Sequence, residues 1–214
     1  MCWIRQLWAL KLKTAKVHDP VEQIRAALRR PGHGSSDFDL NPDTVLPPGR
    51  RLRPAGVLVA ISLAYDAPRV ILTKRSSALK HHPGQIAFPG GKQDETDADV
   101  TAAALREAQE EIGLPPDMPE VLGFLPMHET VTSFNVTPVV AVVRDTFKPV
   151  PEPGEVDEVF STPLAHLLDP ENYLVESRRW RGQKRRYYTV PFGPYYIWGA
   201  TARILRGLAA RVNE

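Results

Sequence analysis

Residues 88–114 begin with the turn Phe88-Pro89-Gly90-Gly91 and end with Arg106-Glu107-Ala108-Gln109-Glu110-Glu111-Ile112-Gly113-Leu114. An acidic loop lies between them, in which Thr96 followed by Asp99 predicts the capping-box start of a helix. Gly113 is a typical helix stop, because glycine readily takes the left-handed conformation that ends many helices. The segment therefore predicts a glycine turn, an acidic loop and a helix.

The expected helix combines an apolar stripe with clustered carboxylates. Apolar residues recur every four positions, at Val100, Ala104, Ala108 and Ile112. At ~100° per residue, Glu107 and Glu111 lie one turn apart beside this stripe, with Glu110 next to them. Like charges at this spacing repel each other, and at the edge of a core they need a compensating positive charge, such as a Mg²⁺ ion. A solvated acidic helix is the alternative interpretation.

The composition of the chain sets broad limits on its class. Its 214 residues suffice for one domain with a sizeable core and terminal extensions. A net charge of +2 excludes neither nucleic acid nor small anions as ligands. The single cysteine, Cys2, excludes an internal disulfide framework and indicates a reducing compartment, so we expect a cytoplasmic protein. No apolar run approaches the roughly 20 residues needed to cross a bilayer.

The N-terminal part is expected to lie outside the main domain. Residues 1–17 form a basic segment that we interpret as an ordinary extension, with an organelle presequence or a membrane-surface helix as alternatives. A secretory signal is not expected, because a clean apolar run and a small-residue cleavage site are missing. Residues 18–52 are expected to contain a short helix, at 19–30, and a linker rich in proline and glycine.

The remainder of the chain is predicted to mix strands and helices. We expect strands at residues 57–63, 69–74, 121–125, 136–143 and 187–192. The fourth of these is almost uninterruptedly apolar, which indicates a central strand. Helices are expected at 163–168 and 198–212, and an acidic turn at 155–158. This mixture, with a long loop before the carboxylate helix, predicts an α/β layered domain.

The glycine turn and the carboxylate helix resemble the Nudix box, usually written Gly-x5-Glu-x7-Arg-Glu-apolar-x-Glu-Glu-x-Gly-apolar. Its second half is filled in order by Arg106, Glu107, Ala108, Glu110, Glu111, Gly113 and Leu114. In the first half, Asp97 stands where the family has Glu, and the distance from Gly91 to Arg106 is one residue longer. The first acidic residue of the family mainly supports the loop, a role that Asp94, Glu95 or Asp97 can fill here.

An upstream motif resembles the coenzyme A pyrophosphatase branch of that family. The pattern of the branch is Leu-Leu-Thr-x-Arg-Ser-x3-Arg-x3-Gly-x3-Phe-Pro-Gly-Gly. This chain has Leu72-Thr73-Lys74-Arg75-Ser76, then Lys80, Gly84 and Phe88-Pro89-Gly90-Gly91. Ile71 replaces the first Leu and Lys80 replaces the second Arg, and lysine cannot make the bidentate phosphate contact of arginine. The same lengthening of the box is familiar in this branch.

The resemblance implies a fold and a reaction. The fold is α/β, an α/β/α sandwich around a mixed β-sheet, over residues 53–190, with residues 191–214 forming a C-terminal helix packed on it. The reaction is hydrolysis of coenzyme A and its thioesters to 4′-phosphopantetheine and adenosine 3′,5′-bisphosphate, with Mg²⁺ or Mn²⁺ neutralising the diphosphate and activating water. A broader nucleoside-diphosphate hydrolase acting on ADP-ribose or dinucleotides is the alternative. A non-catalytic Nudix module is a third possibility, although such modules usually have eroded carboxylates.

The resemblance also implies roles for individual residues. Glu107 and Glu111 would be the principal metal ligands, with Glu110 assisting and the backbone carbonyl of Gly90 as a further oxygen ligand. Arg106 would brace the acidic loop. Basic residues that flank the turn, namely Lys74, Arg75 and Lys80, could hold either the diphosphate or the 3′-phosphate of coenzyme A.

Many members of the family take their general base from a loop outside the box. Here Glu155 is our first candidate and Glu158 the second, and one of the two could instead ligate a metal. A turn that is acidic only for solubility is the alternative. Glu129 and the pair His81-His82 are weaker candidates, and the histidines are better interpreted as polar lining or substrate contacts.

A second basic run extends over residues 178–186, next to Trp180 and Tyr187. Such a run can grip nucleic acid through phosphate contacts and stacking. It is equally compatible with a solvated hairpin or with an oligomer contact, as in a homodimer. We do not expect nucleic-acid binding, because a single basic hairpin is weak support for it.

Overall fold

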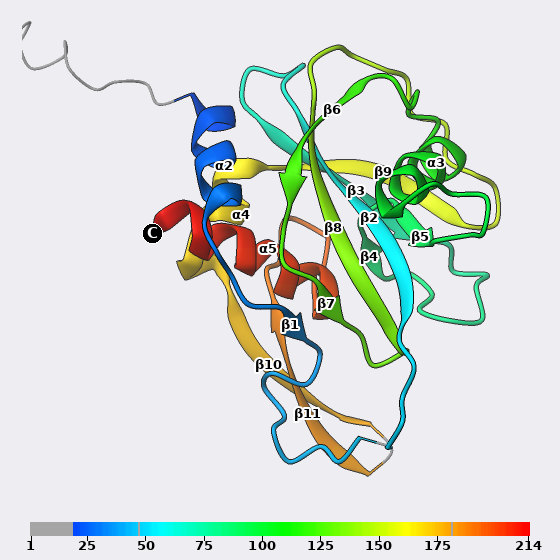
Figure 1. Ribbon diagram of the computed structural model, residues 1–214, viewed down its shortest axis with the longest axis vertical. Coiled ribbons are helices and arrows are strands. Elements are labelled where there is room, and N and C mark those ends of the chain that lie inside the picture. Colours follow the sequence, from blue (N-terminus) through cyan, green and yellow to red (C-terminus); the bar gives the residue numbers. More distant parts are fainter. Residues whose placement is uncertain (1–18, 47, 181) are drawn as a thin grey trace, which may run out of the picture.

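A mixed β-sheet between two layers of helices forms the protein (Figure 1). The computed structural model describes residues 19–46, 48–180 and 182–214, so the expected extension at 1–17 lies outside the described residues. The centre of the sheet is a parallel pair, β2 (Arg53–Ser62) and β8 (Phe134–Val143). Strand β3 (Arg69–Arg75) pairs antiparallel with β2, and β9 (Val156–Pro163) pairs antiparallel with β3. The predicted α/β class is confirmed.

The remaining strands are shorter or peripheral. β6 (Pro119–Phe124) and β7 (His128–Glu129) pair with β8, and β1 (Ser35–Ser36) pairs with β7. β4 (Ile86–Ala87) pairs with β3, and β5 (Gly90–Lys92) pairs with β2. β10 (Leu174–Trp180) and β11 (Gln183–Thr189) form a separate antiparallel hairpin, which projects at the bottom of Figure 1.

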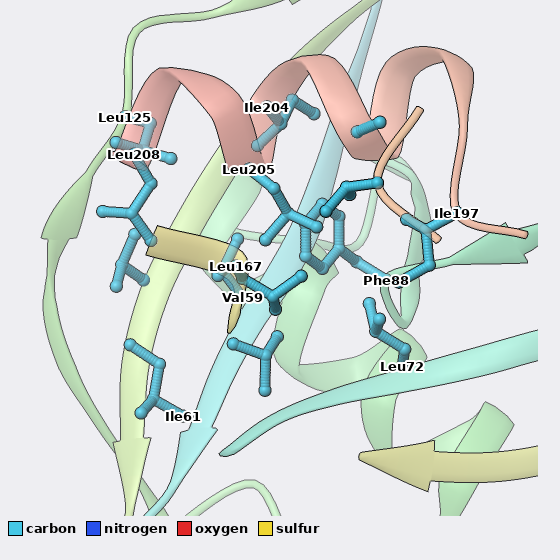
Figure 2. Close-up of a cluster of buried hydrophobic side chains, with 14 of the residues drawn as sticks. Val59, Ile61, Leu72, Phe88, Leu125, Leu167, Ile197, Ile204, Leu205 and Leu208 are labelled. Carbon is cyan, nitrogen blue, oxygen red and sulfur yellow. The ribbon is translucent and has the colours of Figure 1, made fainter. Parts of the chain in front are cut away.

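Each face of the sheet is covered by its own helices. Side chains of a strand alternate between faces, so Leu58 and Ala60 of β2 pack under α3 (Val100–Ile112). Val59 and Ile61 point the other way, against α5 (Gly199–Asn213), α4 (Leu164–Leu168) and α2 (Pro20–Arg29). Figure 2 shows this second cluster, with Leu205 of α5 lying above Val59. None of the helices in the described residues is long and apolar enough to cross a membrane.

Close backbone contact fixes α3 against the sheet. Gly56 of β2 lies under the start of the helix, where an added Cβ would overlap the carbonyl oxygen of Val100 and crowd Ala104. Ala104, Ala108 and Ile112 are fully buried, as the predicted stripe requires. The helix therefore has one orientation on the sheet, and that orientation sets where its carboxylates point.

The structure corrects several expected elements. The helix cap is Asp99 rather than Thr96, because the Asp99 carboxylate accepts the Ala102 N–H. The expected acidic turn at 155–158 is wrong beyond its first residue, since Val156 begins β9 by pairing with β3. The late strand, β11, ends at Thr189 rather than at residue 192. Strand β10 was not predicted from its mainly polar sequence, and its residues 174–179 are all exposed.

Candidate functional site

The glycine turn meets the second half of α3. Strand β5 pairs Gly90 with Val57 and Gly91 with Gly56, which places the turn beside the helix. Gly90 has a φ of 147°, and an added Cβ there would overlap the backbone of β2. Gly113 ends α3 in the left-handed conformation, with φ of 70°. Gly90 therefore allows the turn to lie close against β2, and Gly113 allows the helix to end in the left-handed conformation.

Glu111 is a buried carboxylate of α3 that contacts this turn. Its side chain belongs to a residue only 5% exposed, and its Oε2 accepts the Gly90 N–H at 3.1 Å. Burial raises the pKa of Glu111 to about 7, and the negative charges of Glu107 and Glu155 act in the same direction. The Gly90 hydrogen bond and the positive charge of Arg75 oppose that rise in pKa. The site therefore holds a carboxylate that lacks full charge compensation.

Glu107 lies one helical turn earlier, against Gly91. A Cβ at Gly91 would overlap the Glu107 carboxyl group, so a larger residue there would displace that carboxylate. Burial raises the pKa of Glu107, and Glu110 and Glu155 add to that effect, while Arg106 opposes it. We call Gly90, Gly91, Glu107 and Glu111 the carboxylate turn.

Arg106 and Asp97 brace the acidic loop. Nε and Nη2 of Arg106 donate to the two carboxylate oxygens of Asp97 at 2.9 and 3.0 Å, and the Asp97 carboxylate also accepts the Asp94 N–H. Hydrogen bonding to Arg106 lowers the pKa of Asp97. Of the three acidic residues open to the supporting role, Asp97 is the one in this bidentate pair. Aspartate is one methylene shorter than glutamate, and the longer loop brings Asp97 within hydrogen-bonding distance of Arg106.

Glu110 points away from the carboxylate turn. Its side chain is 57% exposed and accepts a hydrogen bond from Nη1 of Arg106 at 2.8 Å. The same Nη1 lies 3.2 Å from an oxygen of Glu107. Glu110 thus shares the Arg106 guanidinium with Glu107 and belongs to the rim of the site.

Glu155 lies near the carboxylate turn, at the end of a segment docked on α3. The N–H groups of Val150 and Glu152 donate to the carbonyls of Ile112 and Glu111 at 2.9 and 3.0 Å. The Ser76 N–H donates to the carbonyl of Glu155 at 2.8 Å. The side chain of Glu155 is exposed, and its charge acts on both Glu107 and Glu111. The segment is tethered at both ends, so Glu155 is held beside the two carboxylates.

Glu158 is placed differently. It lies in β9 opposite Lys74 and accepts a hydrogen bond from the Tyr195 hydroxyl at 2.5 Å. The Tyr195 ring stacks on Phe160, two residues further along the same face of the strand. Phe160 packs with the α5 layer, on the side of the sheet opposite α3. The structure therefore does not bring Glu158 together with Glu107 and Glu111. Glu129, a weaker candidate, forms an ion pair with Arg50.

The basic residues of the upstream motif divide between two places. Arg75 ends β3 and acts electrostatically on Glu111 on one side and on His82 on the other. Lys74 lies in the same strand and its charge acts on Asp157. Lys80 and His81 lie farther along, in the exposed loop between β3 and β4.

That loop borders a cleft of about 890 Å³. The opposite wall is the β10–β11 hairpin, with the start of α5 and residues 130–132 between them. We call this the basic cleft. It is lined by the charged side chains of Lys80, Arg178, Arg185, Arg186 and Asp37. Part of the second basic run predicted from sequence therefore faces a cavity, while Arg181 lies outside the described residues.

Comparison with known proteins identifies the family. The NUDIX domain matches residues 53–181. The Nudix hydrolase NudL of Cronobacter sakazakii is 43% identical over 162 residues, which cover 76% of this chain and 84% of the relative. The chain belongs to the Nudix family. NudL of Klebsiella pneumoniae strain 342 is 41% identical to this Nudix chain over 189 residues, covering 83% of the chain and 98% of the relative.

A solved structure supports the fold of the Nudix chain. The crystal structure of a MutT/nudix family protein from Enterococcus faecalis superposes with a TM-score of 0.51 at 16% identity. The superposition covers 91% of this chain and 74% of that protein. At this level of identity the similarity concerns the fold alone.

The carboxylate turn of this Nudix chain suits the divalent metal ions that Nudix hydrolases generally use. Its donors are carboxylate and backbone oxygens, which hard cations prefer. Among the described residues, no three or more His, Cys, Asp or Glu side chains gather into a metal-binding group. Mg²⁺ does not require such a set, because it is commonly held by one or two carboxylates together with water and substrate phosphates. The residues present therefore fit a metal ion held jointly by protein and substrate.

The Nudix chain also contains a buried polar cluster that was not predicted from its sequence. His128 is completely buried, with Nδ1 at 2.9 Å from the Ser35 hydroxyl and Nε2 at 3.2 Å from Asp37 Oδ1. Asp37 also accepts the Val131 N–H at 2.8 Å. The cluster joins β1 to β7 and supports one edge of the basic cleft. No local signal reveals it, because Ser35 and Asp37 lie more than ninety residues from His128 in the sequence.

Proposed function

We propose that the chain is a divalent-metal-dependent hydrolase that cleaves the diphosphate bond of coenzyme A and its derivatives. The products would be 4′-phosphopantetheine and adenosine 3′,5′-bisphosphate. The observation that carries the hydrolase is the pair of Glu107 and Glu111 around the Gly90-Gly91 turn, with the raised pKa values that uncompensated carboxylates produce. The upstream motif supports coenzyme A as the substrate. Arg75 of this motif lies close enough to Glu111 for its positive charge to lower the pKa of that carboxylate.

The proposed metal ligands are Glu107, Glu111 and the Gly90 carbonyl. Mg²⁺ or Mn²⁺ held there would neutralise charge on the diphosphate and lower the pKa of a bound water. Glu110 can join these ligands only by releasing Arg106, so we assign it an assisting role. Arg75 would hold diphosphate oxygens as a fixed positive charge, whereas Lys74, expected in the same role, lies on the same face of the sheet as Glu158.

We assign the general base to Glu155 ahead of Glu158. A base must lie within hydrogen-bond reach of the water it deprotonates. The Glu155 carboxylate is exposed and lies near both proposed ligands, whereas Glu158 already accepts a hydrogen bond from Tyr195. Glu155 would take a proton from the attacking water while Glu107 and Glu111 stay ionised.

The test is incubation of the purified protein with coenzyme A and Mn²⁺, followed by chromatography of the products. We expect adenosine 3′,5′-bisphosphate to appear, and to be absent with Glu107→Gln and with chelator. A panel containing ADP-ribose and dinucleotides should show slower turnover than coenzyme A. Efficient cleavage of ADP-ribose without cleavage of coenzyme A would replace this proposal with the broader nucleoside-diphosphate hydrolase.

A further inference from the structure

The lining of the basic cleft has a much larger relative excess of positive charge than the chain as a whole. Its lining contributes four lysine or arginine side chains and one carboxylate, in a protein whose net charge is +2. That carboxylate, Asp37, is already occupied by His128 and by the Val131 N–H. In the described part of the chain, no ion pair joins a carboxylate to Lys80, Arg178 or Arg186. Their charges are therefore available to an anionic ligand.

Aromatic rings lie beside those charges. The Arg178 guanidinium lies 4.2 Å from the centre of the Trp198 ring, and Tyr187 packs edge-on against Trp198 at 5.2 Å. Arg178 and Tyr187 occupy the same face of the hairpin, since their strand partners are Arg185 and Glu176. A guanidinium beside an indole can stack on a planar ring and donate hydrogen bonds to phosphate oxygens. Such a wall suits a phosphorylated nucleoside.

The walls of the cleft are fixed before any ligand arrives. The side chain of Asn41 accepts the Arg186 N–H at 2.8 Å and donates to the Arg186 carbonyl at 2.9 Å. Asp39 of the same segment forms an ion pair with Arg203 of α5 at 2.7 Å. On the other side, the loop before β4 is closed by hydrogen bonds between Arg75 and residues Gly84 and Gln85. A preformed site loses less entropy when it binds.

The cleft and the carboxylate turn are neighbours along the chain. Gln85 lines the cleft, and Gly90 donates to Glu111 only five residues later. Five residues span roughly 18 Å at most, even when fully extended. Arg75 lies between the two places, because its charge acts on both Glu111 and His82. One extended substrate can therefore reach both.

We infer that the basic cleft binds the phosphorylated nucleoside end of the substrate, with Arg178 and Lys80 contacting a phosphate that is not part of the scissile diphosphate. This inference rests on the proposed function, because in coenzyme A that group is the 3′-phosphate of the adenosine. The carboxylate turn then receives the diphosphate, and the pantetheine arm leaves in the other direction.

The first test measures binding alone, by calorimetry on the full chain without metal, using adenosine 3′,5′-bisphosphate and 5′-AMP. The wild type should bind the bisphosphate at least tenfold more tightly, as expected for charged hydrogen bonds to one extra phosphate. Arg178→Ala should reduce this preference to less than threefold, and Lys80→Ala, from the opposite wall, should reduce it as well. Arg179→Ala is the matched control, since Arg179 is exposed, pairs with Lys184 and does not line the cleft.

The second test compares KM for coenzyme A and 3′-dephospho-coenzyme A. Arg178→Ala should raise KM for coenzyme A about tenfold and change KM for the dephospho compound less than threefold. Equal affinity of the wild type for the two nucleotides, or equal losses in Arg178→Ala and Arg179→Ala, would overturn the inference. If coenzyme A is not cleaved but the nucleotide preference is present and lost in Arg178→Ala, the proposed function fails and the cleft assignment stands. Cleavage of coenzyme A without that preference gives the reverse conclusion.

Discussion

The carboxylate turn and the basic cleft are both crowded with like charges, but they are built in opposite ways. The carboxylate turn comes from residues 90–111, and a single helix holds both of its acids. The basic cleft is assembled from residues 37–41, 80–85, 130–132, the β10–β11 hairpin and the start of α5. The first is buried and acidic and suits a cation, and the second is open and basic and suits an anion. A polyphosphate substrate requires both environments within its own length.

Removing one charge from the carboxylate turn should have the largest effect. Glu107→Gln keeps the shape of the side chain against Gly91 but loses one of the two proposed metal-binding carboxylates. We expect turnover of coenzyme A to fall by at least ~10³-fold, since it removes charge stabilisation from the transition state. Steady-state kinetics under saturating Mn²⁺, with circular dichroism to verify folding, provide the measurement.

Glu110→Gln is the matched control for that variant. It makes the same chemical change three residues along α3, on a side chain that is exposed and paired with Arg106. Turnover should fall no more than about tenfold, as expected for an assisting group rather than a principal ligand. Near-normal turnover and metal dependence in Glu107→Gln would refute the assignment of the carboxylate turn.

Replacing Glu155, in the segment that borders the carboxylate turn, should have the second-largest effect on turnover. Glu155→Gln should lower kcat by about 10²-fold, in the range typical of a lost general base, and flatten the acidic limb of the pH–rate profile. Glu158→Gln, which retains a hydrogen-bond acceptor for Tyr195, should change kcat less than about threefold. The opposite ranking of the two variants would move the base to β9 and require Tyr195 to release Glu158.

The same contrast explains what the sequence could predict. The α/β class, α3 and its buried stripe follow from periodicity and short spacings, the bracing role of Arg106 follows from the family resemblance, and the structure confirms them. Strand β10 and the acidic start of β9 were missed, because tertiary pairing overrides weak local preference there. Lys80 was expected to flank the glycine turn and His81 to be polar lining or a substrate contact, and the cleft that both residues line is completed by a hairpin about a hundred residues away. The spacing of residues along the sequence does not show that two such distant segments lie close together in the fold.

The buried acid of the carboxylate turn should make stability depend on pH. The pKa of Glu111 is raised from 4.5 to about 7 in the folded state, so the folded protein binds more protons than the unfolded chain between these values. The free energy of unfolding of the metal-free protein should therefore fall by roughly 2 kcal/mol from pH 5 to pH 7.5. Burial acts on Glu107 in the same direction.

Two comparisons test whether Glu111 causes this pH dependence of stability. Urea titrations across this pH range should give a flatter profile for Glu111→Gln, which has no charge to bury at any pH. Mn²⁺ should restore the lost stability of the wild type at pH 7.5 by binding the ionised carboxylate, and should do so much less in the variant. A wild-type profile that is flat or rises with pH contradicts the raised pKa of Glu111.

Loosening a wall of the basic cleft should have the smallest effect, and one confined to substrate affinity. Asn41→Ala removes both hydrogen bonds to the Arg186 backbone without touching the carboxylate turn. We expect KM for coenzyme A to rise about threefold, because two exposed hydrogen bonds hold the wall in place, while kcat changes less than twofold. Hydrogen exchange should show the Arg186 amide opening faster in the variant, since its acceptor is gone. A loss of kcat comparable to that of Glu155→Gln would mean that the cleft and the carboxylate turn are one cooperative unit. In that case the displacement of the cleft wall would be transmitted to the carboxylate turn through Arg75.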